Sequence, residues 1–153
     1  MSPFNQNLSY DELKEKLLKA NIKVTQQRIV IYQALLNLHN HPSAEQIYEY
    51  IRPTNPSISL GTVYKTLDTF ESTGLVYKVL SPDDQQRYDA NMEYHNHIYC
   101  MKTKEIIDFD DQELNKLIGE YFSRKKIKNF NIEDIRVHVT GQKHNPEDTI
   151  KIN

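Results

Sequence analysis

The stretch SLGTVYKTLDTFESTGLV, residues 59–76, has the pattern of an amphipathic helix whose two ends are marked in the sequence. Ser59 or Thr62 can cap the start, and Gly74 stands where the chain often turns left-handed after a helix. Apolar residues recur at helical spacing at Val63, Leu67 and Phe70. The stretch therefore predicts a helix that buries one face and ends at Gly74.

The other face of this helix carries side chains that suit DNA. It presents two hydroxyls, an aromatic ring and a cation, from Thr62, Thr66, Tyr64 and Lys65. Such groups can contact phosphates and thymine methyl groups. The segment is therefore a candidate recognition helix.

Three further helices are predicted before this segment and a β-hairpin after it. The helices span residues 9–21, 25–38 and 41–53, with capping boxes at Ser9/Glu12 and Ser43/Gln46. The hairpin turns at residues 81–84. This order favours a winged helix-turn-helix, although other α+β domains share it. The formal net charge of −2 indicates no basic patch, so the case for DNA rests on the motif.

A second unit is predicted from about residue 91. Residues 97–109 suggest two strands about a short turn, and a helix follows with a predicted capping box at Asp110 and Glu113. A last strand is predicted from the alternation of Ile135, Val137 and Val139. We expect an α+β protein with a winged-helix DNA-binding domain at 1–90 and a small α/β dimerisation and metal-sensing domain at 91–153. Because a unit of this size buries little surface by itself, we expect it to pair with a second copy.

The stretch YHNHIYC, residues 94–100, places two histidines one residue apart in a predicted strand. Alternate residues of a strand share a face, so His95 and His97 would point into one space. A lone pair of this kind is more often structural, and a metal needs further ligands. The single cysteine, Cys100, rules out an internal disulfide and a thiolate zinc cage, so any metal must be held by nitrogen and oxygen.

The N-terminal residues lack the pattern of a signal peptide, and the longest apolar run is only a few residues. A membrane span needs about 20 consecutive apolar residues. We therefore expect a cytoplasmic protein that does not enter the membrane.

Several motifs together resemble one family, the Fur-type metalloregulators, which are dimeric bacterial repressors. The resemblance extends from about residue 9 to 141. It rests on KVTQQR (23–28), HPSAEQIY (41–48), SISLGTVYKTL (57–67), GLV (74–76), RYD (87–89), HNH (95–97) and EIIDF (105–109). It implies a winged helix that binds a palindromic DNA operator and a second domain that forms a homodimer.

The resemblance also implies a regulatory metal site built from both domains. Its ligands would be His41, Asp89, His95, His97 and Asp108. Imidazoles and carboxylates without a thiolate suit Fe²⁺ or Mn²⁺, with Zn²⁺ as a further possibility in vitro. On the DNA side, the resemblance favours Thr62, Tyr64 and Lys65 for the recognition helix, with Lys23 and Arg28 as backbone or minor-groove contacts.

The two aspartates make the chain most similar to the peroxide-sensing PerR type, because iron-responsive members tend to carry glutamates there. The resemblance implies that Fe²⁺ and H₂O₂ oxidise His41 or His95, which releases the DNA. This is a single self-modification, so the protein is expected to be a repressor and not an enzyme. Such a repressor would control peroxide-defence and metal-homeostasis genes.

The chain departs from the family pattern at its cysteines. Most relatives carry two C-x-x-C pairs that hold a structural zinc, whereas here only Cys100 is kept and Thr103 replaces its partner. No structural zinc is therefore expected. A second metal site beside the histidines would need Tyr94 and Asn96, which ligate poorly, so we expect one metal per subunit.

Two other functions fit the same residues. The first is an iron- or manganese-responsive repressor of metal uptake with little peroxide sensitivity. The second is a non-haem iron enzyme that uses the histidines and aspartates. The winged helix leaves little of the chain to form a substrate pocket, which disfavours the enzyme.

Overall fold

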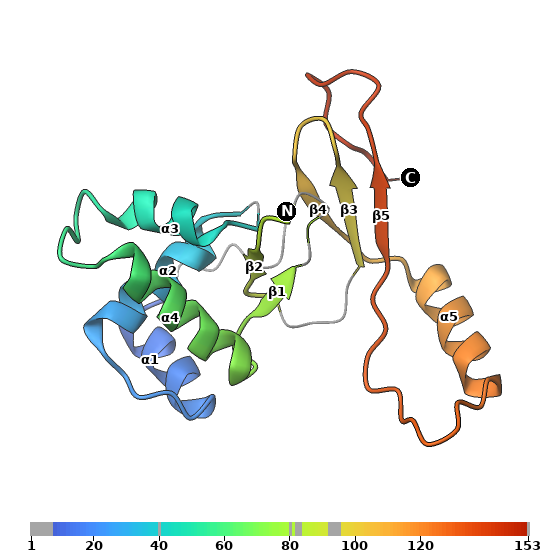
Figure 1. Cartoon of the computed structure of the whole chain (residues 1–153), viewed down its shortest axis with the longest axis horizontal. Helices are drawn as coiled ribbons and strands as arrows, with labels where there is room; N and C mark the ends of the chain where they lie inside the picture. Colours follow the sequence, from blue (N-terminus) through green and yellow to red (C-terminus); the bar gives the residue numbers. More distant parts are fainter. Residues whose placement is uncertain (1–7, 40, 80, 82–83, 92–95, 153) are drawn as a thin grey trace. The chain divides into compact units, whose positions relative to one another are not determined.

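The computed structural model describes residues 8–39, 41–79, 81, 84–91 and 96–152 of the chain (Figure 1). The chain divides into two compact units, residues 1–92 and 93–153. The fold is mixed α+β, as expected, with four helices and a hairpin described in the first unit and a sheet and a helix in the second. Among the described residues, no helix is long and apolar enough to cross a membrane.

The helices of the first unit begin at the predicted caps. They are α1 (Tyr10–Lys19), α2 (Gln26–Asn37), α3 (Ala44–Ile51) and α4 (Leu60–Ser72). Each cap side chain accepts a backbone N–H of the first turn, and the caps are Ser9, Thr25, Ser43 and Ser59. The predicted capping boxes at Ser9 and Ser43 are both confirmed. Each such cap contributes about 1 kcal/mol to stability.

The end of α4 and the wing also follow the sequence pattern. Gly74 has a φ of 78°, and the next residue, Leu75, donates its N–H to the carbonyl of Phe70 at 2.8 Å. The chain then forms β1 (Tyr77–Val79), which pairs antiparallel with β2 (Arg87–Asp89). This pairing confirms the predicted hairpin after α4, while residues 82 and 83 of its predicted turn lie outside the described residues.

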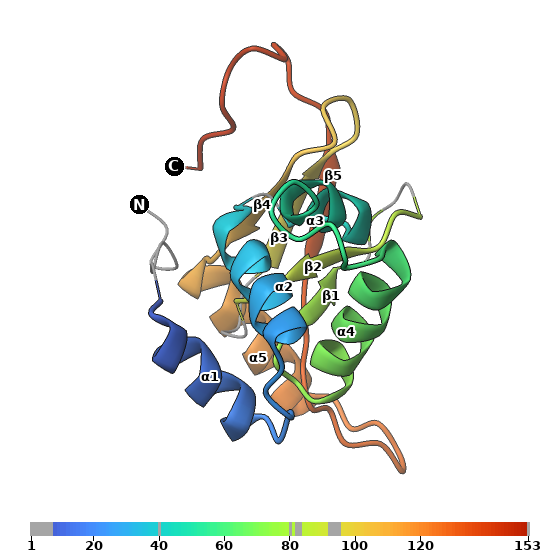
Figure 2. The ribbon, with the colours of Figure 1, turned by 90° about the vertical axis from the view of Figure 1, so that its left-hand side faces the viewer.

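The core of the first unit lies between its helices (Figure 2). It includes the fully buried side chains of Leu17, Ile31, Ile47, Leu67 and Phe70. Phe70 of α4 meets Tyr32 of α2 edge to face, with ring centroids 5.7 Å apart. This packing fixes the inner face of α4. Thr66 belongs to that face, because it is only 6% exposed, so its predicted place on the DNA-facing side is wrong.

The second unit contains a three-stranded sheet and one helix. Its strands are β3 (Asn96–Cys100), β4 (Ile106–Phe109) and β5 (His138–Gly141), in the order β4-β3-β5. β4 pairs antiparallel with β3, whereas β5 pairs with it in parallel. The helix α5 (Gln112–Arg124) lies between β4 and β5 in sequence.

Two details of this unit differ from the sequence prediction. The cap of α5 is Asp111, whose side chain accepts the N–H of Leu114, and not the predicted Asp110. The last strand begins only at His138, because the N–H of Val137 is taken by the Asn96 side chain at 2.9 Å instead of a strand carbonyl. The Asp110 carboxylate, which does not cap α5, accepts a hydrogen bond from the side-chain amide of Asn115 at 3.1 Å.

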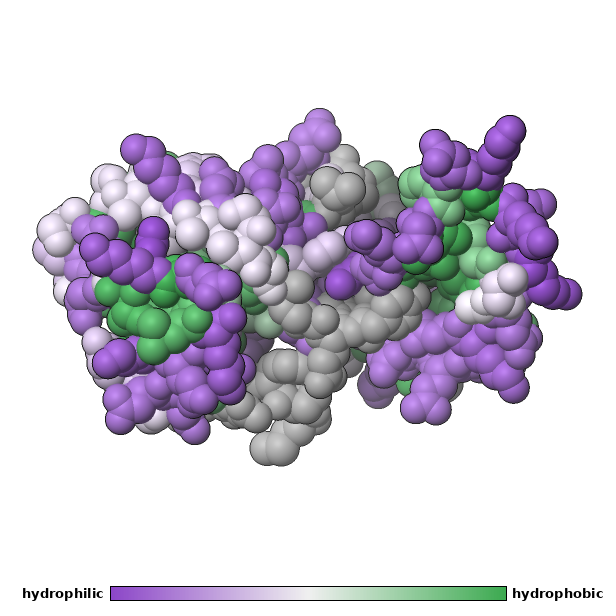
Figure 3. All heavy atoms as spheres, turned by 90° about the horizontal axis from the view of Figure 1, so that it is seen from below, coloured by the Kyte–Doolittle hydropathy of each residue, from purple (hydrophilic) through white to green (hydrophobic). Residues whose placement is uncertain are grey.

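The apolar stripe of α5 is open in a single chain. All of α5 is described, and none of its residues is buried. Leu117 and Tyr121 are 59% and 49% exposed. Hydrophobic side chains are visible among hydrophilic ones on the right-hand part of Figure 3, where the second unit is drawn. An amphipathic helix normally buries its apolar stripe, so this face is available to a partner.

Candidate metal centre and recognition helix

The first unit contains a buried histidine–aspartate pair. His41 lies just before α3 and Asp89 ends β2, and they are 6% and 8% exposed. Their Nε2 and Oδ2 atoms are 3.2 Å apart. The second carboxylate oxygen of Asp89 accepts the N–H of Asn91 at 2.8 Å. The carboxylate is therefore oriented by its own chain while one oxygen faces the imidazole.

The backbone of His41 takes an unusual conformation. Its φ is 52°, in the left-handed region, and it precedes Pro42, which restricts the residue before it. The carbonyl of Pro42 accepts the N–H of Tyr88 in β2 at 3.0 Å, which ties this turn to the wing. Strained residues of this kind cluster at functional sites. The contact between this imidazole and Asp89 therefore comes with an unfavourable backbone conformation at His41.

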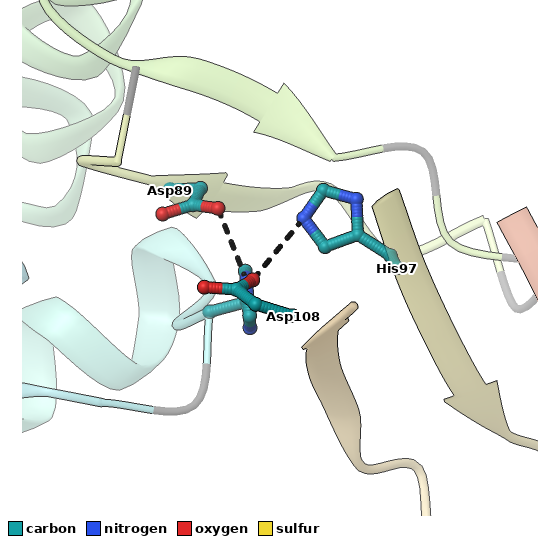
Figure 4. A group of neighbouring side chains, drawn as sticks. Asp89, His97 and Asp108 are labelled. Carbon is teal, nitrogen blue, oxygen red and sulfur yellow. Dashed lines mark hydrogen bonds and ion pairs between the residues drawn. The ribbon is translucent and has the colours of Figure 1, made fainter. Parts of the chain in front are cut away.

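The second unit contains a matching pair across two strands. His97 of β3 is opposite Asp108 of β4 in the antiparallel register, and Nε2 lies 3.5 Å from Oδ1. A dashed line joins the two side chains in Figure 4, which also shows the Asp89 carboxylate at the end of its strand. His97 is 1% exposed, whereas the Asp108 side chain is 37% exposed. His95, the other predicted histidine of this strand, lies outside the described residues.

A further histidine lies beside His97. The parallel pairing of β5 places His138 next to His97, with ring centroids 5.4 Å apart. Burial, followed by the charges of His97 and Arg136, lowers the pKa of His138. A lowered pKa favours the neutral imidazole, which can accept as well as donate a hydrogen bond. Its place beside His97 depends on a long-range strand pairing that leaves no local signal in the sequence.

Each pair offers an imidazole nitrogen and a carboxylate oxygen. Such donors suit Fe²⁺, Mn²⁺ and Zn²⁺, and the absence of a thiolate argues against a copper(I) or iron–sulfur site. The residues of the two pairs therefore fit a divalent first-row metal.

Cys100 is the last residue of β3 and is buried. The hydroxyl of Thr103, followed by its backbone N–H, lowers the pKa of Cys100 to about 7. The backbone N–H of Lys143 also donates to its sulfur at 3.4 Å, and Lys143 Nζ lies 2.7 Å from Glu105. The segment after β5 is thus tied to the β3–β4 turn by a hydrogen bond and an ion pair.

The side chain of Asn96 is engaged in hydrogen bonds and is fully buried. Its amide nitrogen donates to Asn115 of α5 at 3.0 Å, and its oxygen accepts the N–H of Val137 at 2.9 Å. Both polar atoms of the side chain are thus engaged within the protein. The side chain also links α5 to the strand that carries His97.

The predicted DNA contacts all lie in the first unit, and three of them already have partners within the protein. Arg28 donates to the carbonyl of Lys23 at 2.8 Å, and the Thr62 and Ser59 hydroxyls are 3.0 Å apart. The Tyr64 hydroxyl donates to the Glu45 carboxylate. Lys23 and Lys65 have exposed side chains. The contact between Glu45 and Tyr64 was not foreseen from the sequence.

A model of the ferric uptake regulator family matches residues 19–140. The chain belongs to this family. It is 37% identical to the peroxide-responsive repressor PerR of Staphylococcus epidermidis over 109 residues, which are 69% of this chain and 73% of that protein. Proteins of the family are transcription regulators and not enzymes, so the non-haem iron enzyme is set aside.

Two solved structures of the family extend the similarity to most of the chain. The ferric uptake regulator from Pseudomonas aeruginosa with manganese has a TM-score of 0.72 and 30% identity, and the match covers 86% of this chain and 98% of that one. The Campylobacter jejuni peroxide stress regulator has a TM-score of 0.65 and 29% identity, and the match covers 91% and 99%. The protein is therefore a Fur-family metal-responsive transcription regulator.

Proposed function

We propose that the protein is a cytoplasmic, dimeric repressor that binds a palindromic DNA operator when metal is bound and releases it after oxidation by peroxide. Its regulated genes would serve peroxide defence and metal homeostasis. The observation that carries the proposal is the pair of histidine–aspartate contacts, His41 with Asp89 and His97 with Asp108. Aspartate stands in both contacts, as in the PerR type of the family, and the similarity to a PerR supports this choice.

The metal ligands proposed are the four residues of these contacts together with His95. The first two belong to the winged-helix unit and the others to the second unit. Binding one ion to both sets would link the units, so that metal binding and DNA binding would favour the same arrangement. We propose Fe²⁺ or Mn²⁺ as the cellular metal, since geometry and availability select among such ions more than affinity does.

The peroxide response is proposed to be a modification of the protein itself. Bound Fe²⁺ would supply the redox chemistry by which H₂O₂ adds one oxygen to a histidine ring and leaves the other as water. His41 or His95 would be the ring modified. Loss of an imidazole ligand would remove the link between the units, so the operator would be released.

Operator recognition is assigned to the exposed face of α4. Thr62, Tyr64 and Lys65 would contact bases and phosphates, while Lys23 and Arg28 would contact the DNA backbone or minor groove. The open apolar stripe of α5 and the edge strand β5 would form the homodimer. A two-fold dimer with recognition helices about 34–36 Å apart fits two half-sites separated by one turn of DNA.

The proposal is tested by mass spectrometry on protein loaded anaerobically with Fe²⁺ and then given a stoichiometric amount of H₂O₂. We expect one added oxygen on the His41 or His95 peptide, and none in a Mn²⁺-loaded control. An unmodified protein that still needs Fe²⁺ to bind DNA would instead support an iron-responsive repressor of metal uptake. The similarity to a Fur with manganese keeps a manganese-responsive repressor as the related alternative.

A further inference from the structure

The tyrosine assigned to DNA contact is held at both ends by the protein. Its ring packs against the hydrophobic core of the first unit, and its hydroxyl donates a hydrogen bond to the carboxylate of Glu45. Tyr64 belongs to α4 and Glu45 to the first turn of α3, so the bond joins the two helices. A side chain fixed at its base and at its tip has few rotamers left.

The environment of Glu45 favours the ionised carboxylate that accepts this bond. The hydrogen bond from Tyr64, followed by its own backbone N–H, lowers the pKa of Glu45. The start of a helix also favours a negative charge. Glu45 is therefore ionised at neutral pH, and its bond to the phenol is charge-assisted and stronger than a neutral one.

The charge of Glu45 is unfavourable for simple attraction to DNA. A carboxylate next to a DNA-contacting face repels phosphates and weakens binding to any sequence. Its presence beside Tyr64 is better explained by the orientation that it gives to the ring. A ring that is already ordered loses less entropy on binding than a mobile one.

The same turn of chain carries a proposed metal ligand. Glu45 follows His41 by four residues, and Ser43 between them caps α3. The carbonyl of Pro42 accepts a hydrogen bond from the N–H of Tyr88, the residue before Asp89 in β2. The position of Glu45 is therefore set by the same local structure that holds His41 against Asp89.

We propose that Glu45 is a positioning residue that orients Tyr64 for reading bases and so raises specificity for the operator over other DNA. The inference rests on the proposed function, because it requires α4 to enter the DNA groove. Glu45 would then affect which sequence is bound without contacting DNA itself. The base feature that suits an oriented aromatic ring is the thymine methyl group.

The test compares DNA affinities of Mn²⁺-loaded dimers, using a duplex selected from a random-sequence library by the wild-type protein and an unselected duplex of equal length. Glu45→Ala should lower the ratio of selected to random affinity about three- to tenfold, the cost of ordering one freed side chain. Glu45→Gln keeps an acceptor for the phenol, so it should raise affinity for both duplexes and largely keep the ratio. Thermal unfolding of each variant checks that it is folded.

Two further variants separate positioning from other roles. Glu49→Ala removes an exposed carboxylate one turn after Glu45 on the same helix. Glu49 forms an ion pair with Arg52 and not a hydrogen bond with Tyr64. The substitution should change affinity through charge alone and keep the ratio. Tyr64→Phe should lower the ratio as Glu45→Ala does, and the double variant should lower it no further, because both break the same bond.

Wild-type selectivity separates the two proposals. A wild-type protein that enriches no sequence from the library would contradict the proposed function and this inference with it. A selective wild type whose Glu45→Ala variant is equally or more selective would overturn this inference alone. A loss in Tyr64→Phe without one in Glu45→Ala would likewise overturn it and assign the hydroxyl to a direct DNA contact.

Discussion

His97 of β3 and Asp108 of β4 are cross-strand partners, with Nε2 and Oδ1 3.5 Å apart. The strand pairing fixes this contact, because residues opposite each other in an antiparallel sheet keep their side chains close. The histidine is buried while the carboxylate is partly exposed. The sheet therefore orients a nitrogen and an oxygen donor together before any metal binds.

Replacement of Asp108 by Ala should weaken Mn²⁺ binding. The substitution removes one oxygen donor and leaves the imidazole without its cross-strand carboxylate, so affinity should fall at least about tenfold. Isothermal titration of the metal-free protein with Mn²⁺ measures the loss. Glu113→Ala, which removes an exposed carboxylate from the start of α5, is the matched control. Equal affinities of the two variants would argue that Asp108 is no ligand.

Substitutions of His41 should depend on the backbone as well as on the ring. Asn tolerates a left-handed conformation better than Ala, so His41→Ala should be less stable than His41→Asn by about 1 kcal/mol. Urea unfolding of the two metal-free variants measures the difference. Identical stabilities would indicate that the left-handed turn before Pro42 relaxes when the histidine is removed.

Replacement of Leu117 by Asp should separate the dimer. This residue is 59% exposed in a single chain, so the change costs the monomer little. A carboxylate in the proposed interface should raise the dimer dissociation constant about 30-fold or more. Analytical ultracentrifugation can compare it with Lys116→Asp, a change on the opposite face of α5. A dimer that survives Leu117→Asp unchanged would place the interface elsewhere.

Chelation should remove the regulatory metal without separating the dimer. The chain has one cysteine, so no four-cysteine zinc can hold the subunits together. Light scattering before and after EDTA, with metal content followed in parallel, should show an unchanged mass as the metal is lost. Monomers appearing on chelation would mean that a metal stabilises the interface.

Replacement of Lys143 by Ala should loosen the chain after β5 and expose Cys100. The variant loses the ion pair with Glu105, which is partly exposed and worth about 1 kcal/mol at most. Because the pKa of Cys100 is lowered to about 7, the thiol reacts readily once accessible. Iodoacetamide at pH 7.5 should therefore label the variant faster than the wild type, with Lys151→Ala as the control. Equal rates would show that Lys143 does not hold the segment in place.

Local signals in the sequence predicted the helices of the first unit well. Capping boxes depend on residues three apart, so Ser9 and Ser43 mark helix starts that the structure confirms. Gly74 marks the end of α4, where the backbone is left-handed. The start of α5 was misplaced by one residue, because Asp110 and Asp111 are both suitable caps and only the folded backbone selects one.

Long-range pairing explains what the sequence could not predict. The parallel alignment of β5 with β3, which places His138 beside His97, joins segments about 40 residues apart with no local mark. The bond between Glu45 and Tyr64 similarly depends on how α3 packs on α4. Only the resemblance pointed to His41, Asp89, His97 and Asp108 as metal ligands, and their contacts as two histidine–aspartate pairs come from the fold.

The most direct test of the account is the affinity of the wild-type protein for its selected duplex with Mn²⁺ and after chelation, measured by fluorescence anisotropy. We expect chelation to weaken binding about 10- to 100-fold, the range of ordinary allosteric coupling. His97→Ala should bind weakly in both conditions. Wild-type affinity that is the same with and without metal would contradict the claim that metal controls DNA binding.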